Sequence, residues 1–116
     1  MSSDGKARVR NLGPREVATL LKRAHDADVP LLLDVREPWE LDICRIEGSH
    51  SLPMNQVPGA LDRLDRGREI VCICHHGIRS YQVARFLEHQ GFARIINLDG
   101  GVAAWAREVD PTMRTY

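Results

Sequence analysis

The sequence predicts an α/β domain with a mostly parallel central sheet of about five strands and helices on both faces. Short apolar runs at 31–35, 70–74 and 95–98 are typical of strands that are buried on both faces. Between these runs, apolar residues recur at helical spacing, and an alternation of strands and helices favours a parallel sheet. A length of 116 residues with 43% hydrophobic and 28% charged residues fits one globular domain.

The first half of the chain contains the patterns of three strands and two helical segments. Polarity alternates at its start, as in an edge strand, and Pro14 suits the first turn of a helix whose apolar residues line one face. Pro53 favours an edge position for the third strand, because proline cannot donate a ladder hydrogen bond. In order, we expect a strand at 7–10, a helix at 15–25, a strand at 31–35, one or two helical turns at 37–42 and a strand at 51–53.

The second half continues the alternation and ends in a helix. The spacing of Val83, Phe86 and Leu87 predicts a helix that stops at Gly91. In order, we expect a short helix around 60–64, a strand at 70–74, a helix at 79–89, a strand at 95–98 and a helix at 102–107. The domain is therefore expected over 7–109, between tails at 1–6 and 110–116.

Charge and cysteine content narrow the functional classes. Sixteen basic and sixteen acidic residues give no net charge, so nothing indicates binding to nucleic acid or to an anionic membrane. No apolar run approaches the ~20 residues of a membrane-spanning helix, and the first residues lack the apolar stretch of a signal peptide. We therefore expect a reducing cytoplasm, where Cys44, Cys72 and Cys74 are thiols rather than a disulfide framework.

Two of the predicted strands end in reactive side chains. In open parallel sheets, ligands bind beyond the carboxyl ends of the strands. One strand ends at Asp34 and leads to Arg36, whereas the other ends at Cys74 and leads into a loop and a helix. The residues that follow this cysteine are His75, His76, Gly77, Ile78, Arg79 and Ser80.

The residues after Cys74 favour its thiolate form. Gly77 allows backbone conformations that are closed to other residues, so successive loop amides can point inward as an anion-binding nest. The positive end of the 79–89 helix lies beside this loop, and Arg79 adds a full charge. These effects predict a nucleophilic Cys74 in a cradle that also holds an anion attached to, or attacked by, the sulfur.

At these residues the chain resembles the rhodanese family of sulfurtransferases, from about Leu12 to Trp105. The resemblance rests on five motifs in order: Leu32-Leu33-Asp34-Val35-Arg36-Glu37, Glu47-Gly48 before Leu52-Pro53, Cys74-His75-His76-Gly77-Ile78-Arg79-Ser80, Gly91-Phe92, and Leu98-Asp99-Gly100-Gly101 with Trp105. It implies a rhodanese-like three-layer fold in which Cys74 carries a transferable sulfur as a persulfide. The loop amides would hold that sulfur, and Arg79 would anchor the loop.

The same resemblance implies the partners of the reaction. The donor would be thiosulfate or a protein persulfide, and the acceptor would be cyanide, a thiol or a sulfur-carrier protein. No metal, nucleotide or organic cofactor would be needed. Arg45 stands where the family commonly has histidine, and Glu47 replaces a common proline, so substrate contacts in that stretch are expected to differ.

Two other functions remain as alternatives. Cell-cycle dual-specificity phosphatases share the architecture but hold one residue more between the cysteine and the arginine of their loop. Here four residues separate Cys74 from Arg79, which favours sulfur transfer over a phosphatase or an arsenate reductase. The other alternative is a non-catalytic binding or regulatory module, and the retained Cys74 argues against it.

Several neighbouring residues have two interpretations. Cys72 is interpreted as a core residue, with resolution of a Cys74 persulfide as the alternative. His75 and His76 either tune the charge of the pocket or supply only their backbone amides. Asp34 and Arg36 either pair with each other or contribute to the site, Arg36 as a contact for a substrate anion. The cysteines and histidines lack the two separated ligand pairs of a structural zinc site, so no metal is expected.

Overall fold

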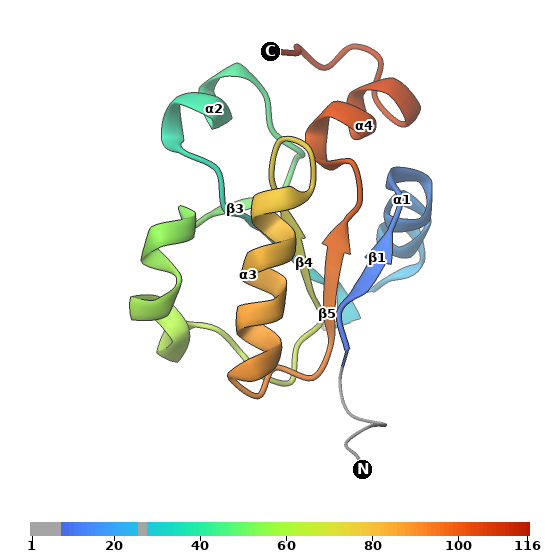
Figure 1. Ribbon diagram of the computed structural model, residues 1–116. Helices are drawn as coiled ribbons and strands as arrows, with labels where there is room; N and C mark the ends of the chain where they lie inside the picture. Colours follow the sequence, from blue (N-terminus) through green and yellow to red (C-terminus); the bar gives the residue numbers. More distant parts are fainter. Residues whose placement is uncertain (1–7, 26–27) are drawn as a thin grey trace.

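A computed structural model describes residues 8–25 and 28–116 of the chain and contains a five-stranded parallel sheet (Figure 1). The strands lie in the order β1-β5-β4-β2-β3. Their bounds are β1 Arg10–Leu12, β2 Leu31–Asp34, β3 His50–Ser51, β4 Ile70–Ile73 and β5 Ile95–Leu98. The three central strands are the three apolar runs of the sequence, and every residue in them is buried. The predicted α/β class and the parallel sheet are confirmed.

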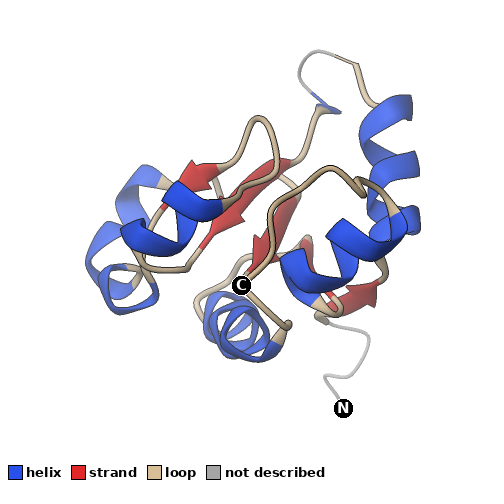
Figure 2. Cartoon of the chain, turned by 90° about the horizontal axis from the view of Figure 1, so that it is seen from above, coloured by secondary structure: helices blue, strands red, loops and turns tan. Residues whose placement is uncertain are grey.

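Helices cover both faces of this sheet (Figures 1 and 2). Their bounds are α1 Pro14–Arg23, α2 Pro38–Ile43, the 3-10 helices η2 Met54–Gln56 and η3 Pro58–Arg63, α3 Ile78–His89 and α4 Gly101–Glu108. On one face α1 packs against α4, and on the other α3 lies on β4 and β5 with the 3-10 helices beside it. The short α2 follows the carboxyl end of β2.

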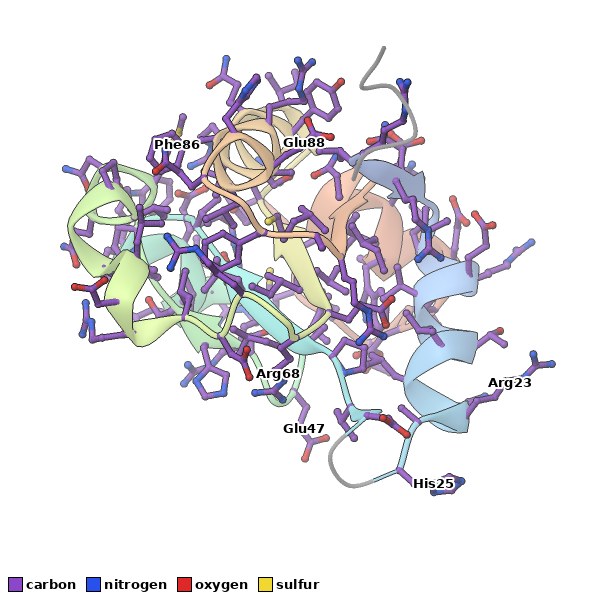
Figure 3. All side chains as sticks on the ribbon, turned by 90° about the horizontal axis from the view of Figure 1, so that it is seen from below. Arg23, His25, Glu47, Arg68, Phe86 and Glu88 are labelled. Carbon is purple, nitrogen blue, oxygen red and sulfur yellow. The ribbon has the colours of Figure 1, made fainter. Side chains whose placement is uncertain are left out.

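Alternation along the strands divides the core into two clusters, one on each face. In β4, Ile70 and Cys72 face the α3 side, whereas Val71 and Ile73 face α1 and α4. Figure 3 shows Phe86 of α3 on the side of the 3-10 helices, while Arg23 and His25 extend outward at the end of α1. Burial of apolar side chains on both faces stabilises the sheet and fixes its register.

The strand order reverses between the adjacent strands β2 and β4, which makes this the topological switch point of the sheet. β2 leads outward to β3 at one edge, whereas β4 leads through α3 to β5 on the other side. The loops that follow these adjacent strands therefore diverge at their carboxyl ends, which is where parallel sheets place their binding sites. Asp34 ends β2, and Cys74 directly follows β4.

The structure shifts several predicted boundaries. The first strand is Arg10–Leu12, where 7–10 was predicted, and residue 7 of that prediction lies outside the described residues. Its register places Arg10 opposite Ile96 of β5. The second edge strand is His50–Ser51, and the short helix around 60–64 is the 3-10 helix η3. The predicted tail at 1–6 lies outside the described residues. In the described part of the chain, no helix is both long enough and apolar enough to span a membrane.

Candidate active site

Cys74 lies at the start of a loop that joins β4 to α3. Its side chain is buried, with 1% of the residue exposed. The backbone N–H of Gly77 donates to its Sγ atom at 3.1 Å, and the N–H of Ser80 donates to the same atom at 3.3 Å. Two N–H groups that donate to one buried sulfur stabilise a negative charge on it. Such hydrogen bonds are stronger in the protein interior than in water, because the local dielectric constant is lower.

The loop holds this shape through two glycines. Gly77 has φ of 95°, in the left-handed region, and a Cβ there would lie 3.0 Å from the backbone nitrogen of Gly100. Gly101 approaches the loop more closely still, since a Cβ at this position would overlap the carbonyl oxygens of Cys74 and His75. Those carbonyls accept hydrogen bonds from the first turn of α4, from Val102 at 2.9 Å and Ala103 at 3.0 Å. The loop is therefore fastened to the start of α4.

Asn97 of β5 fastens the other end of the loop. Its Nδ2 donates to the carbonyl of Gly77 at 3.1 Å, and its Oδ1 accepts from the hydroxyl of Ser80 at 2.6 Å. Asn97 and Ser80 are both buried. Sequence analysis does not identify Asn97 as part of the site. The sequence does carry one indication of its role, because Asn97 is a polar residue inside an apolar strand and a buried amide requires hydrogen-bond partners.

Arg79 forms a bidentate ion pair with Glu40 of α2. Both N···O distances are 2.8 Å. Arg79 holds the pKa of Glu40 down at about 2, because its guanidinium hydrogen-bonds the charged carboxylate. Glu40 also accepts from the backbone N–H of Glu37 at 2.9 Å, within the first turn of α2. The loop is thus tied to α2, and Glu40 is a second residue that sequence analysis misses.

Arg36 is a buried structural residue in this arrangement. Its Nε and Nη2 donate to the carboxylate of Asp34, with the Nη2 contact at 2.8 Å, and both side chains are fully buried. Nη2 also donates to the carbonyl of Cys44 at 2.7 Å. Of the two interpretations, mutual pairing of Asp34 and Arg36 describes the geometry. The interpretation of Arg36 as a contact for a substrate anion does not agree with this burial.

His75 and His76 lie side by side at the start of the loop. Their ring centroids are 3.9 Å apart. Burial, followed by the neighbouring His76, lowers the pKa of His75 below its usual range, so its imidazole is neutral at pH 7. The other face of His75 stacks on the ring of Tyr116 at 3.9 Å between centroids. His75 therefore adds little positive charge to the loop at neutral pH.

The remaining residues near Cys74 differ sharply in exposure. Cys72 is fully buried in the core, and burial raises the pKa of its thiol to about 12. Ile78, by contrast, is 71% exposed, so it contributes an apolar side chain to the surface beside the loop. Cys44 is half-buried, and all three cysteines are free thiols.

The geometry suits covalent chemistry at a single sulfur. A thiol lies at the carboxyl edge of the sheet, amides point at it, and a short loop surrounds it. Within residues 8–25 and 28–116, no three His, Cys, Asp or Glu side chains gather as a metal site would require. The cradle provides what a nucleophilic thiolate and a bound sulfur anion both require, which is a set of fixed hydrogen-bond donors.

Comparison with known proteins agrees with this fold. A family model described as the rhodanese-like domain matches residues 16–108. A protein of Allochromatium vinosum named sulfurtransferase is 38% identical over 89 residues, which are 77% of this chain and 83% of that protein. YtwF of Bacillus subtilis, whose name assigns it provisionally to the sulfurtransferases, is 37% identical over 84% of this chain and 95% of its own.

Two further matches extend the comparison. The crystal structure of a rhodanese-related protein from Thermoplasma volcanium superimposes with a TM-score of 0.75 at 30% identity, over 86% of this chain and 93% of that one. YrkF of Bacillus subtilis, provisionally named a sulfur carrier protein, is 36% identical over 77% of this chain. The matched part is only 49% of that protein's length.

Proposed function

The chain belongs to the rhodanese-like domain family, and from that premise we propose that it is a sulfurtransferase in which Cys74 carries the transferred sulfur. Relatives named sulfurtransferases support sulfur transfer in general. The identity of the cysteine, the persulfide intermediate and the reaction partners are our proposal. The rhodanese-type reaction, in which thiosulfate is the donor, is the form that we propose.

The reaction divides into two displacements. The Cys74 thiolate attacks the outer sulfur of thiosulfate, a new S–S bond forms, and the old S–S bond breaks. Sulfite leaves with the electron pair, so Cys74 becomes a persulfide anion. Cyanide or a thiolate then attacks the terminal sulfur, the persulfide bond breaks, and the Cys74 thiolate returns. Covalent catalysis of this kind replaces one difficult transfer by two easier ones and requires no external oxidant or reductant.

The observation that carries the proposal is the convergence of the Gly77 and Ser80 amides on the Cys74 sulfur. The same donors that stabilise the thiolate would stabilise the terminal sulfur of a persulfide after a small displacement. Cys72 lacks this support and has a pKa raised to about 12 by burial, so it remains a thiol at neutral pH. The chemistry therefore belongs to Cys74 rather than Cys72.

The proposed partners are a small sulfur-containing anion or a sulfur-carrier protein. Neutral His75 leaves less positive charge at the loop than lysine or arginine would, so strong selection for thiosulfate over a protein persulfide is not expected. A relative named as a sulfur carrier protein supports the protein partner. The proposal includes neither nucleic acid nor a membrane.

Steady-state kinetics with thiosulfate and cyanide test the proposal. We expect parallel double-reciprocal lines, the pattern of a ping-pong mechanism. Cys74→Ser should abolish turnover, whereas Cys72→Ala, which changes a cysteine two residues earlier, should retain it. The same preparations should be assayed with an aryl phosphate. Faster hydrolysis of the phosphate than transfer of sulfur would favour the phosphatase alternative, and neither activity would favour a binding module.

A further inference from the structure

The segment that follows α4 returns to the active site. The N–H of Asp110 donates to the carbonyl of Trp105 at 3.0 Å, and the N–H of Met113 donates to the carbonyl of Asp110 at 3.0 Å. The Met113 side chain packs against the core cluster of α1 and α4. From there the chain runs across the top of the molecule toward α2 (Figures 1 and 2). Sequence analysis assigns 110–116 to a tail, whereas the structure packs it against the domain.

Tyr116 connects this segment both to the loop after β4 and to α2. Its ring stacks on His75 with an interplanar angle of 10°, and it meets the ring of Trp39 edge-on at 5.8 Å. Its hydroxyl donates to Oε1 of Glu40 at 2.7 Å and accepts from Nη1 of Arg36 at 2.9 Å. One side chain thus bridges α2 and the first residue of the Cys74 loop.

Arg36 and Glu40, the polar partners of Tyr116, also make hydrogen bonds with other residues. Arg36 is held by Asp34, and Glu40 is held by Arg79 and by the amide of Glu37. Both partners therefore keep their places without the phenol, and the phenol docks into a site that is already formed. Burial raises the pKa of Tyr116 to about 12, so the hydroxyl keeps the proton that it donates to Glu40 at neutral pH.

The chain just before Tyr116 is held less closely. A cavity of about 190 Å³ lies between it and the loop, lined by His75 and His76 on the loop side and by Arg114, Thr115 and Tyr116 on the other. The segment is therefore anchored at Met113 and at Tyr116, with open space between these two points. Release of the Tyr116 contacts would let residues 114–116 move away from the loop while Met113 stays packed.

We propose that Tyr116 is a latch that closes one side of the mouth of the Cys74 loop and makes the site selective for acceptor size. This inference rests on the proposed function, because the acceptor must reach a sulfur on Cys74, which is 1% exposed. A small acceptor such as cyanide reaches the sulfur past the closed latch. A bulky thiol or a carrier protein requires the ring of Tyr116 to leave His75.

Alkylation of Cys74 tests the latch without any sulfur transfer. Iodoacetamide serves as the small reagent and a dye-linked maleimide as the bulky one, with modification at Cys74 followed by peptide mass mapping. Tyr116→Ala should speed the bulky reaction by roughly tenfold, since the loss of one or two hydrogen bonds shifts an equilibrium by about that factor. The iodoacetamide rate should change little, which also verifies that the loop remains folded.

Two further variants sharpen the result. Tyr116→Phe keeps the stacked ring but loses both hydrogen bonds, so its effect should be intermediate. Tyr81→Ala removes a tyrosine of similar exposure from α3, 36% against 37%, and should leave both rates unchanged. Equal acceleration of both reagents by Tyr116→Ala would overturn the latch in favour of general ordering of the site. No acceleration of the bulky reagent would also overturn it.

Acceptor kinetics connect the latch to sulfur transfer. In the thiosulfate assay, Tyr116→Ala should raise the ratio of kcat/KM for glutathione to that for cyanide by roughly tenfold, for the same reason. If Cys74 takes up no sulfur but the alkylation contrast holds, the proposed function fails and the latch remains a gate on a thiol. If Cys74 takes up sulfur but the acceptor ratio is unchanged, the latch fails and the proposed function stands.

Discussion

Cys74 and Cys72 are two residues apart and belong to the same core cluster, yet their environments differ. Both are buried, but the Gly77 and Ser80 amides reach only the sulfur at the end of the strand. Burial without donors raises the pKa of Cys72 to about 12, because the charged form loses its hydration. The local backbone therefore gives hydrogen-bond donors to Cys74 and none to Cys72, which supports the proposal that Cys74 is the nucleophile.

Glu40 is the residue that connects the loop to α2, and its titration offers a prediction. Its pKa falls from the usual value of 4.5 to about 2, because Arg79 hydrogen-bonds its charged form. A carboxyl group whose pKa is depressed in the folded protein stabilises the fold at pH values above 4.5, its usual pKa. This stabilisation is lost as the pH falls from 4.5 through 2. Glu40→Gln should lower the free energy of unfolding at pH 7 by about 1–2 kcal/mol, because it removes the charge that pairs with Arg79. The loss stays modest because Arg79 is partly solvated.

Urea unfolding at several pH values measures this effect. The difference between wild type and Glu40→Gln should be full at pH 7 and shrink as pH falls below about 4.5. Glu88→Gln is the control, since Glu88 pairs with the half-exposed Arg85 at 3.2 Å. The control should cost less than about 0.5 kcal/mol. A Glu40→Gln difference that does not change between pH 7 and pH 2.5 would contradict the role of the Arg79 pair.

At the scale of elements, three of them build the loop between β4 and α3. β4 delivers Cys74 to the edge of the sheet, α4 holds the loop carbonyls, and β5 supplies Asn97 to its far side. The loop is short because only four residues lie between Cys74 and Arg79. We expect a loop this short, in which two amides reach the Cys74 sulfur, to suit one sulfur better than a tetrahedral oxyanion, which requires more donors around it.

Lengthening this loop should exchange part of the sulfur chemistry for oxyanion binding. Insertion of one glycine after Gly77 widens the ring while it keeps Cys74 and Arg79. We expect slower sulfur transfer together with tighter binding of phosphate, arsenate or tungstate, measured by calorimetry beside turnover. Insertion of a glycine after Gly67, in an exposed turn before β4, is the matched control and should change neither property. Loss of sulfur transfer with no gain in oxyanion affinity would mean that the insertion only disorders the loop.

At the scale of the whole molecule, local patterns were enough to predict the sheet. The runs 31–35, 70–74 and 95–98 are buried on both faces, so their pattern does not depend on distant residues. The edge strand at the start of the chain was misplaced because its register depends on β5, far away in the sequence. The strand–loop–helix setting of Cys74 was predicted because a strand, a glycine and a helix are consecutive around it, and the role of this cysteine stays a prediction.

The site residues that could not be predicted from the sequence have partners that are distant in the chain. Glu40 and Arg79 are 39 positions apart, and Tyr116 and Arg36 are 80 positions apart. The topology brings them together where the loops after β2 and β4 diverge. No periodicity or local motif reports such contacts, although the polar Asn97 inside an apolar strand carries a signal. The contacts that hold the loop therefore required the fold, whereas the candidate nucleophile, which stays a prediction, was chosen from local sequence.

Sulfur transfer by the proposed mechanism requires a sulfur atom carried by Cys74. The most direct measurement is the intact mass of the protein after incubation with thiosulfate and removal of excess reagent. We predict a gain of one sulfur atom, reversed by a reducing thiol and absent in Cys74→Ser, with Cys72→Ala behaving as wild type. A gain that survives in Cys74→Ser and disappears in Cys72→Ala, or no gain in the wild-type protein, would contradict the account.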